Sequence, residues 1–452
     1  RRMKKILLAV ACCAMTLLAQ ANPAHKVKIN DGLTVSVEAC SESIFRIKVS
    51  PRKDFTESLM ERYELIKTDW SDVKTDISDK GGVWTLKTSE YSLAINKKTG
   101  VMTVKDSKGG KVIREVRFLP EKEGLCGEMR SFINEKYADL KVADNGGGII
   151  GDDNGKFGEV DKHEIPAADA VSILSFSMED GERFYGGGST SRDHIQHRGE
   201  FLRMWTTYQQ TEIPMPFMMS SRGWGVYNNS TRKSFFDIGN QQKSKFNIIN
   251  TFDEADFFLM MGKDMPAILN EYTLVTGRTY VLPKWAYGLC FGPNMREEQF
   301  DILNDAVRFR QFDVPCDVFW LEPQWMEKRY DFSTKKKWNY DRFSPEPYWL
   351  QDQYPKTMHN RLFIGKLRSM GFHLGLWLCE EYDLSIQEED IIAERTGGKL
   401  SGQEHWMDHL TVFMDQGVEG FKLDPARTID NHTNWEYYNG RTDKEMHNLN
   451  QV

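Results

Sequence analysis

After Pro283 the chain repeats one order of elements, in which an apolar strand is followed by a polar or acidic loop and then a helix. The expected strands cover residues 285–291, 314–321, 373–378 and 420–424. Apolar spacing and stop signals predict helices between them, over 296–311, 358–370 and 405–416. Repeated units of this kind imply a parallel sheet whose strands all end at the same edge.

The last of these strands ends on Asp424, and Lys422 lies two positions before it. Because side chains alternate between the two faces of a strand, Lys422 and Asp424 point the same way and Phe421 points the other way. In a closed parallel barrel, alternate residues face the axis and the carboxyl ends of the strands form the active-site rim. We therefore predict that Asp424 is a catalytic carboxylate that Lys422 keeps ionised.

Polar and aromatic residues follow the other strands too, and convergence from separate strands is a stronger signal than any one residue. Glu322 directly terminates the second strand and Trp325 follows it, while Glu381 comes just after the third. A carboxylate at a strand end can also be a helix N-cap. Glu322 is a better functional candidate because it directly ends an apolar run. For Trp377, inside the third strand, core packing and contact with a ligand are both open.

Residues 25–278 have a different texture, with short alternating strands broken by turn signals. The clearest expected strands are 26–30, 33–38, 44–49, 91–95 and 100–105. This pattern predicts an antiparallel β-sandwich. The Gly-, Asp- and Asn-rich stretch 144–156 predicts a loop insertion. We therefore expect a sandwich domain over 25–278 and a partial (β/α)8 barrel with four strands over 279–452.

The first 24 residues have the order of a secretory signal peptide, because Lys4 and Lys5 precede an apolar run and then small residues. The run is too short to span a bilayer, so we expect no integral membrane segment in the mature chain. The predicted location is periplasmic or extracellular. A lipid anchor at Cys12 is disfavoured, because the apolar stretch before it is short and Cys13 follows at once.

Composition limits the partners. The formal net charge is −7 and basic runs are absent, which argues against nucleic acid as a partner. Aromatic residues make up 12% of the chain, and Trp and Tyr suit sugar rings, although large cores use the same residues. The cysteines after the leader have no metal-finger spacing and are best explained as buried small hydrophobes, namely Cys40, Cys126, Cys290, Cys316 and Cys379. We expect no cofactor and no metal.

Several motifs together resemble glycoside hydrolase family 31, the retaining α-glycosidases with an N-terminal β-sandwich and a catalytic barrel. They are Glu182-Arg183-Phe184-Tyr185-Gly186-Gly187-Gly188, the glycine-aromatic run 220–227, Leu282-Pro283-Lys284-Trp285, residues 314–318 followed by Glu322, and Lys422-Leu423-Asp424. The resemblance covers nearly the whole mature chain.

The resemblance implies that Asp424 is the nucleophile and that the acid/base comes from a later strand beyond Val452. Since a (β/α)8 barrel usually takes about 250 residues, we expect the chain to be an inactive fragment of a longer enzyme. Carbohydrate contacts would come from Glu322, Trp325, Trp377, Glu381, Lys422 and Arg427.

Two positions depart from the family pattern, which has Asp at the position of Glu322 and commonly Glu at the position of Arg427. Lys-x-Asp with a trailing Arg also resembles the α-galactosidases of family 36. We therefore predict a sugar other than plain glucose, with α-galactosyl or α-N-acetylgalactosaminyl groups as candidates. An alternative function is a non-catalytic carbohydrate-binding relative of the same fold. An Asp after a later strand of the full-length gene would favour the enzyme.

Overall fold

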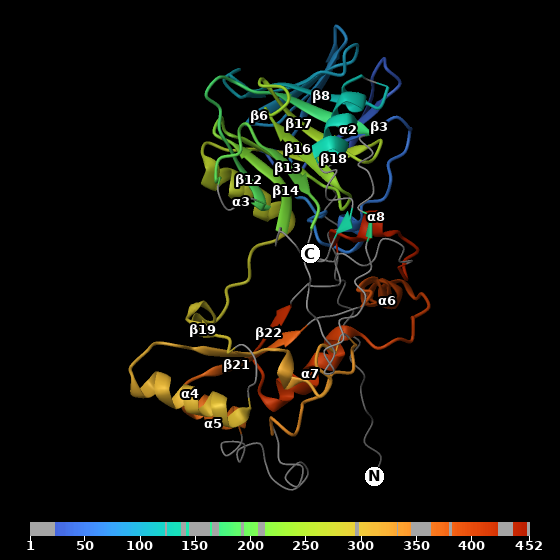
Figure 1. Ribbon diagram of the computed structural model, residues 1–452. Helices are drawn as coiled ribbons and strands as arrows, with labels where there is room; N and C mark the ends of the chain where they lie inside the picture. The colour runs from blue at the N-terminus through green and yellow to red at the C-terminus, as the bar shows by residue number, and fades with distance from the viewer. Residues whose placement is uncertain are drawn as a thin grey trace, which may run out of the picture.

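The structure is a computed structural model, and it describes residues 23–122, 124–136, 142–143, 163–164, 171–190, 194–206, 213–293, 298–331, 333–344, 363–378, 382–423 and 437–449. Figure 1 shows two parts, a β-rich N-terminal part and an α/β part coloured yellow to red. Apart from Pro23 and Ala24, the predicted signal peptide lies outside the described residues, as does the predicted loop 144–156.

The N-terminal part contains two large antiparallel sheets. The seven-stranded sheet has the order β1 (His25–Lys28), β2 (Thr34–Ala39), β3 (Ile44–Ser50), β18 (Ala255–Met261), β15 (Trp224–Asn228), β14 (Ile213–Ser220) and β12 (Phe184–Ser189). The nine-stranded sheet has the order β13 (Phe201–Met204), β16 (Ser234–Ile238), β17 (Lys245–Asn250), β11 (Ser172–Ser177), β8 (Lys111–Pro120), β7 (Met102–Asp106), β6 (Tyr91–Asn96), β5 (Val83–Lys87) and β4 (Asp76–Lys80). A small sheet pairs β9 (Val142–Ala143) with β10 (His163–Glu164).

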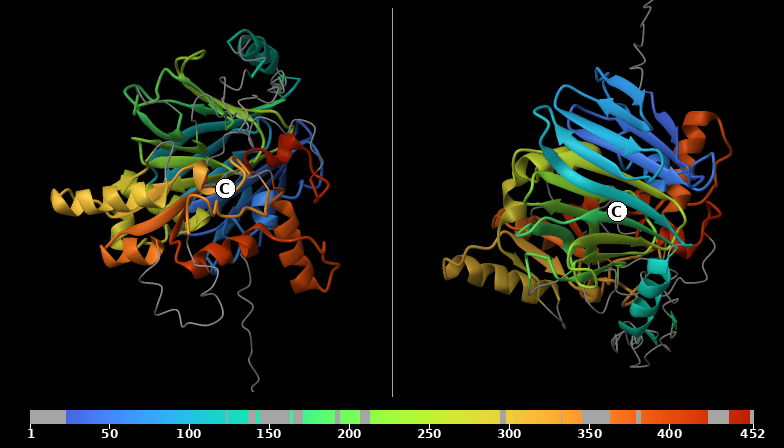
Figure 2. Two further views of the ribbon diagram at one scale, coloured as in Figure 1. Left: turned by 60° about the horizontal axis from the view of Figure 1, so that its bottom comes forward. Right: turned by 90° about the horizontal axis from the view of Figure 1, so that it is seen from above.

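Large apolar side chains from both sheets share one core, so the predicted β-sandwich is confirmed. Figure 2 shows the strands of this part from two further directions. Trp224 of β15 stacks on Phe176 of β11 at 5.2 Å between ring centroids, and Phe176 stacks on Phe246 of β17 at 5.6 Å. The predicted strands 91–95 and 100–105 correspond to β6 and β7, which pair with each other, with Ile95 opposite Met102. Three helices accompany the sheets, α1 (Leu59–Arg62), α2 (Gly124–Lys136) and α3 (Met265–Thr276).

The α/β part contains a four-stranded parallel sheet, as predicted. Its strands are, in order, β19 (Cys290–Phe291), β20 (Val318–Leu321), β21 (His373–Leu378) and β22 (Gly420–Leu423). Its helices are α4 (Gln299–Gln311), α5 (Phe363–Ser369), α6 (Ser385–Thr396) and α7 (Trp406–Gln416). Gly417 ends α7 in a left-handed conformation with φ 111°, so the predicted stop signal is confirmed.

Three elements of this part differ from the prediction. The expected strand 314–321 begins only at Val318, as β20. The expected strand 285–291 is a 3₁₀ turn over Lys284–Tyr287 followed by the two-residue strand β19. The indole of Trp285 stacks on the imidazole of His373, with 4.0 Å between the ring centroids. Trp285 therefore makes its packing contact from a 3₁₀ turn, although its apolar character had predicted a strand. The prediction also missed α6, which lies between the third strand and α7.

Polar contacts join the two parts near α8 (Asp443–Met446). Arg62 Nε donates to Glu389 of α6 at 2.8 Å, and Arg232 pairs with Glu445 of α8 at 2.9 Å. None of the helices within the described ranges is both long and apolar enough to cross a membrane.

Lys233 is buried where the sandwich contacts the segment after α8. Its ammonium lies 4.6 Å from the Trp205 ring centroid, and Trp205 stacks on His447. Burial lowers the pKa of Lys233 to about 7, with Arg203 and Lys444 adding to the effect and Asp443 opposing it.

The lowered pKa of Lys233 predicts a pH-dependent stability. The unfolded chain keeps this lysine protonated up to about pH 10, so the folded state gains stability as pH rises above 7. Between pH 7 and pH 9 the gain is about 2 kcal/mol. We expect Lys233→Met to remove this gain, measured as the difference in free energy of unfolding from the unsubstituted protein. The exposed Lys243→Met is the control, and an equal pH slope for both variants would contradict the prediction.

Candidate functional site

The carboxyl ends of the parallel strands bring together residues that are far apart in the sequence. Glu322 follows β20 directly, and its Oε1 lies 3.3 Å from Nζ of Lys422 in β22. A Cβ built on Gly292, just after β19, would lie 3.6 Å from the same Glu322 oxygen. Three of the four strands therefore contribute to one place at the edge of the sheet.

The Glu322–Lys422 pair is partly solvated, with 19% of the Glu322 side chain and 45% of the Lys422 side chain exposed. Lys422 was expected to face the axis of a closed barrel, but β22 is an edge strand of the described sheet and the Lys422 side chain stays partly exposed. Lys422 was also expected to be paired with Asp424. In the described residues its partner is Glu322, whereas Asp424, Arg427 and Glu381 lie outside them.

Trp320 lies two residues before Glu322, and its indole covers the face of the sheet on which Gly375 and Gly420 lie. The register pairs Trp320 with Gly375, and Gly375 with Gly420. A Cβ on Gly375 would come within 2.1 Å of the Trp320 ring, and one on Gly420 within 2.9 Å. The two glycines thus leave the space that the indole fills. Trp320 is half-buried, and the sequence prediction overlooked it, although its spacing of two from Glu322 puts both on one face.

The contact between Trp320 and Gly375 predicts the effect of a single methyl group. Gly375→Ala should displace the indole and lower the free energy of unfolding by about 1–3 kcal/mol, as overpacking does elsewhere. The control is Gly127→Ala in α2, where no atom lies within 4 Å of the new methyl group. Chemical denaturation measures both variants, and equal stability of the two would contradict the packing argument.

Trp325 was predicted to contact a sugar, and Trp377 either to contact a sugar or to pack in the core; both indoles are buried in the structure. Trp325 is fully buried, and its Nε1 donates to the Trp377 carbonyl oxygen at 2.8 Å. Its indole therefore turns into the core from the short turn Pro323–Trp325. Trp377 shares a face with Lys422, but Tyr330 packs edge-on against it at 5.5 Å and only 3% of it is exposed.

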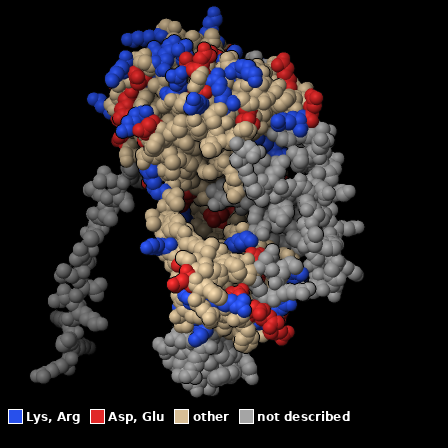
Figure 3. Space-filling view, turned by 60° about the vertical axis from the view of Figure 1, so that its left-hand side comes forward, with Lys and Arg blue, Asp and Glu red and all other residues tan. Residues whose placement is uncertain are grey.

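Figure 3 shows that one face of the molecule is hollowed between the two parts, with acidic atoms deep in the hollow. No group of three or more metal-ligating side chains occurs in the part of the chain that the structure describes. What the described site offers is one carboxylate and one ammonium beside an aromatic surface. Such a set can hold a hydroxylated ligand through charge-assisted hydrogen bonds.

A β-sandwich followed by parallel βα units, with charged side chains at the strand ends, defines a two-domain barrel protein with its site on the barrel rim. The chain belongs to glycoside hydrolase family 31. The family model described as "Glycosyl hydrolase 31 N-terminal galactose mutarotase-like domain" matches residues 34–237. The model described as "Glycosyl hydrolases family 31 TIM-barrel domain" matches residues 279–452.

Similar proteins agree with this assignment. An α-xylosidase of Emericella nidulans is 22% identical over 334 residues, which are 67% of this chain and 40% of the relative. An α-xylosidase of Saccharolobus solfataricus is 27% identical over 319 residues, which are 65% of this chain and 40% of the relative. The chain thus spans about 40% of the length of these curated relatives.

The fold is also found in solved structures. A Flavobacterium johnsoniae family 31 dextranase complexed with isomaltotriose has a TM-score of 0.64 at 17% identity, covering 96% of this chain and 51% of that one. A family 31 α-xylosidase from a soil metagenome, complexed with xylose, has a TM-score of 0.65 at 15% identity, covering 95% and 60%.

Proposed function

We propose that the chain is part of an exported retaining α-glycoside hydrolase that removes terminal α-linked sugars from oligosaccharides or glycans by double displacement. The observation that carries the proposal is the Glu322–Lys422 pair at the strand ends of a family 31 barrel domain, in which Lys422 lies two positions before Asp424. Export rests on the signal-peptide pattern of the first 24 residues.

In the proposed reaction, Asp424 attacks the anomeric carbon and forms a covalent glycosyl-enzyme, which water then hydrolyses. If the period of two along β22 continues past Leu423, the side chain of Asp424 would lie on the face of Lys422. The ammonium of Lys422 would favour the ionised carboxylate that attack requires. Glu322 and Glu381 would accept hydrogen bonds from sugar hydroxyls, and Lys422 and Arg427 would donate them.

A retaining enzyme also needs a protonated carboxyl about 5–5.5 Å from the nucleophile. We assign that role to an Asp on a later strand, outside this chain, so the chain alone should be inactive. Exposed apolar side chains support such a missing neighbour. The exposed fractions are 58% for Leu423 of β22, and 52% for Val412 and 55% for Met414 of α7. In a closed barrel, further strands and helices would cover these surfaces.

The sugar preference follows from Glu322. Its side chain is one methylene longer than the usual Asp, so its carboxylate reaches further into the site. We expect the full-length protein to turn over aryl α-galactosides or α-N-acetylgalactosaminides faster than the α-glucoside. A panel of aryl α-glycosides measures kcat/KM for each sugar, and NMR of the first product anomer tests retention. A clear preference for the α-glucoside would contradict this prediction.

Because two of the similar proteins are α-xylosidases, an α-xyloside is a second candidate substrate, and the panel includes an aryl α-xyloside. If no aryl glycoside is turned over and the full-length gene has no later Asp, the non-catalytic carbohydrate-binding function replaces the enzyme.

A further inference from the structure

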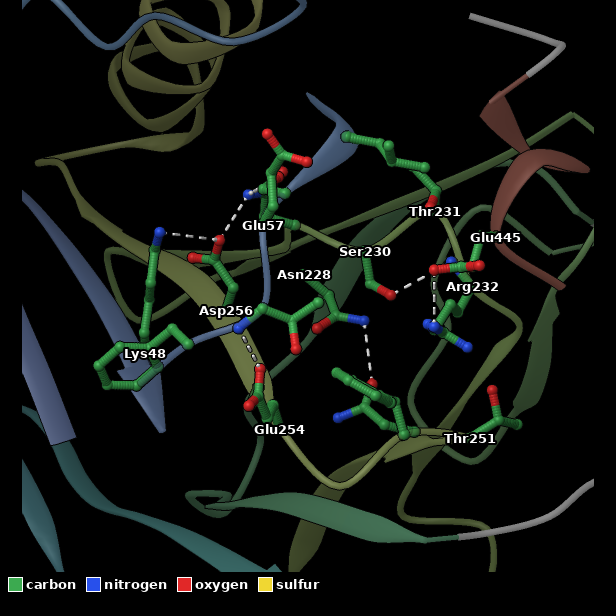
Figure 4. Close-up of a pocket in the computed structure, with 18 residues that line it drawn as sticks. Lys48, Glu57, Asn228, Ser230, Thr231, Arg232, Thr251, Glu254, Asp256 and Glu445 are labelled. Atoms are coloured by element: carbon green, nitrogen blue, oxygen red, sulfur yellow. Dashed lines mark hydrogen bonds and ion pairs between the residues drawn. The ribbon is translucent and has the colours of Figure 1, made fainter. Parts of the chain in front are cut away.

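A second polar pocket lies at the end of the sandwich beside α8, outside the barrel part. Its volume is about 80 Å³ (Figure 4). Three chain segments line it, namely residues 55–59 after β3, residues 228–232 after β15 and residues 250–256 between β17 and β18. Glu445 of α8 also lines it. Because β15 and β17 belong to different sheets, the pocket opens where the two layers of the sandwich separate.

The charged groups of this pocket are already paired with other protein groups. Arg232 bonds Glu445 at 2.9 Å, and Nζ of Lys48 lies 4.0 Å from Asp256. The carboxylate of Glu254 accepts from the Ser50 hydroxyl at 2.8 Å. Carboxylates outnumber cations in the lining, which consists, among charged residues, of Lys48, Arg232, Glu57, Glu254, Asp256 and Glu445. This balance disfavours a phosphate or another anion.

The neutral groups, in contrast, keep unused hydrogen-bonding capacity. Asn250 is 4% exposed and Asn229 is 5% exposed. Nδ2 of Asn250 and Oδ1 of Asn229 have no hydrogen-bond partner among the described residues. A buried donor and a buried acceptor in one pocket each cost free energy when left unpaired. A hydroxyl group can satisfy both kinds of atom, because it donates and accepts.

Two aromatic side chains form an apolar wall of the pocket, and its volume is small. The guanidinium of Arg232 lies 4.4 Å from the ring centroid of Phe252, and Phe55 lines the pocket as well. Aromatic rings suit the C–H faces of sugars, whereas the amides suit the hydroxyl edge. At about 10–15 Å³ for each water-sized group, the volume has room for several such groups. A single ring fits this volume better than a longer chain.

We propose that this pocket binds one neutral pyranose unit, as a carbohydrate site separate from the barrel rim. The site does not depend on hydrolysis. It would hold a sugar residue of the same glycan or of another one, and it would couple the sandwich to α8 through the Arg232–Glu445 pair.

Titration calorimetry of the full chain with D-glucose, D-galactose and D-xylose, each added separately, tests the site. We expect saturable binding of at least one sugar. Asn250→Asp removes the Nδ2 donor but keeps the oxygen that accepts from Asn228 Nδ2 at 3.2 Å. It should weaken binding about five- to tenfold, as the loss of one hydrogen bond does. Ser230→Phe fills the pocket from its rim. In the Glu322→Gln/Lys422→Met background, which lacks the proposed sugar contacts of the barrel rim, it should abolish binding.

Three controls make the test specific. Ser107→Phe places the same ring on an exposed hairpin turn and should leave binding unchanged. Far-UV circular dichroism and thermal unfolding verify that each variant is folded. The Glu322→Gln/Lys422→Met variant should bind the sugar as the unsubstituted chain does. The proposal is overturned if no sugar binds saturably, if folded Ser230→Phe binds normally in that background, or if binding is lost only in the barrel variant.

Discussion

Replacing Asp424 with Asn is expected to lower turnover of aryl α-glycosides by the full-length enzyme on the order of a thousandfold or more. The amide has almost the same shape as the carboxylate, but it carries no negative charge and cannot form the glycosyl-enzyme ester. The loss should appear in kcat for all sugars alike, because attack at the anomeric carbon is common to them. Single-turnover assays should also show no trapped intermediate.

The matched control is Glu322→Gln, which makes the same change from a carboxylate to an amide at the end of β20. Glu322 pairs with Lys422 and is proposed to hold hydroxyls, so its loss should affect KM and sugar selectivity more than the chemical step. Thermal unfolding should be the same for Asp424→Asn and the parent enzyme. Residual activity close to that of the parent would remove the assignment of Asp424 as the nucleophile.

The fold could be predicted where local patterns decide it. β21 was predicted with both of its ends, because an apolar run follows the glycine stop at Gly371, whose φ is 79°. The strand 285–291 was predicted wrongly because its apolar content resembles a strand. Whether Trp285 pairs in a sheet or stacks on His373 depends on a contact 88 positions away (373 minus 285), which spacing cannot show.

The candidate site shows the same division. The sequence correctly predicted that Glu322 and Lys422 lie at the same edge of the sheet. This prediction needs only the alternation of side chains along a strand and the parallel order of the strands. The direction of Trp325 was missed, because a three-residue turn after β20 sends its indole toward the Trp377 carbonyl. The sandwich pocket was invisible in the sequence, since Asn229 and Asn250 come together only when the sheets stack.

A buried ionic network lies within the seven-stranded sheet, around Arg46 of β3, the strand next to β18. Only 4% of this side chain is exposed, and its Nε donates to Asp256 of β18 at 2.9 Å. It also bonds Glu61 of α1 and lies 5.1 Å from the Phe258 ring centroid. Burial alone would lower the pKa of Arg46, but the two carboxylates outweigh burial and raise it. The charged guanidinium therefore compensates the negative charges of Glu61 and Asp256.

Arg46→Met should lower the free energy of unfolding by about 3–5 kcal/mol, the cost of breaking a buried ion pair from one side. The methionine fills much of the same volume, so the loss reports the uncompensated charges of Asp256 and Glu61. The matched control is Arg395→Met, whose pair with Glu64 is exposed on both sides, so its loss should leave the free energy of unfolding almost unchanged. In a Glu61→Gln/Asp256→Asn background the cost of Arg46→Met should shrink, because the two negative charges that Arg46 compensates are then absent. Urea denaturation measures all of these variants, and an unchanged cost in that background would show that packing, and not charge, makes Arg46 important.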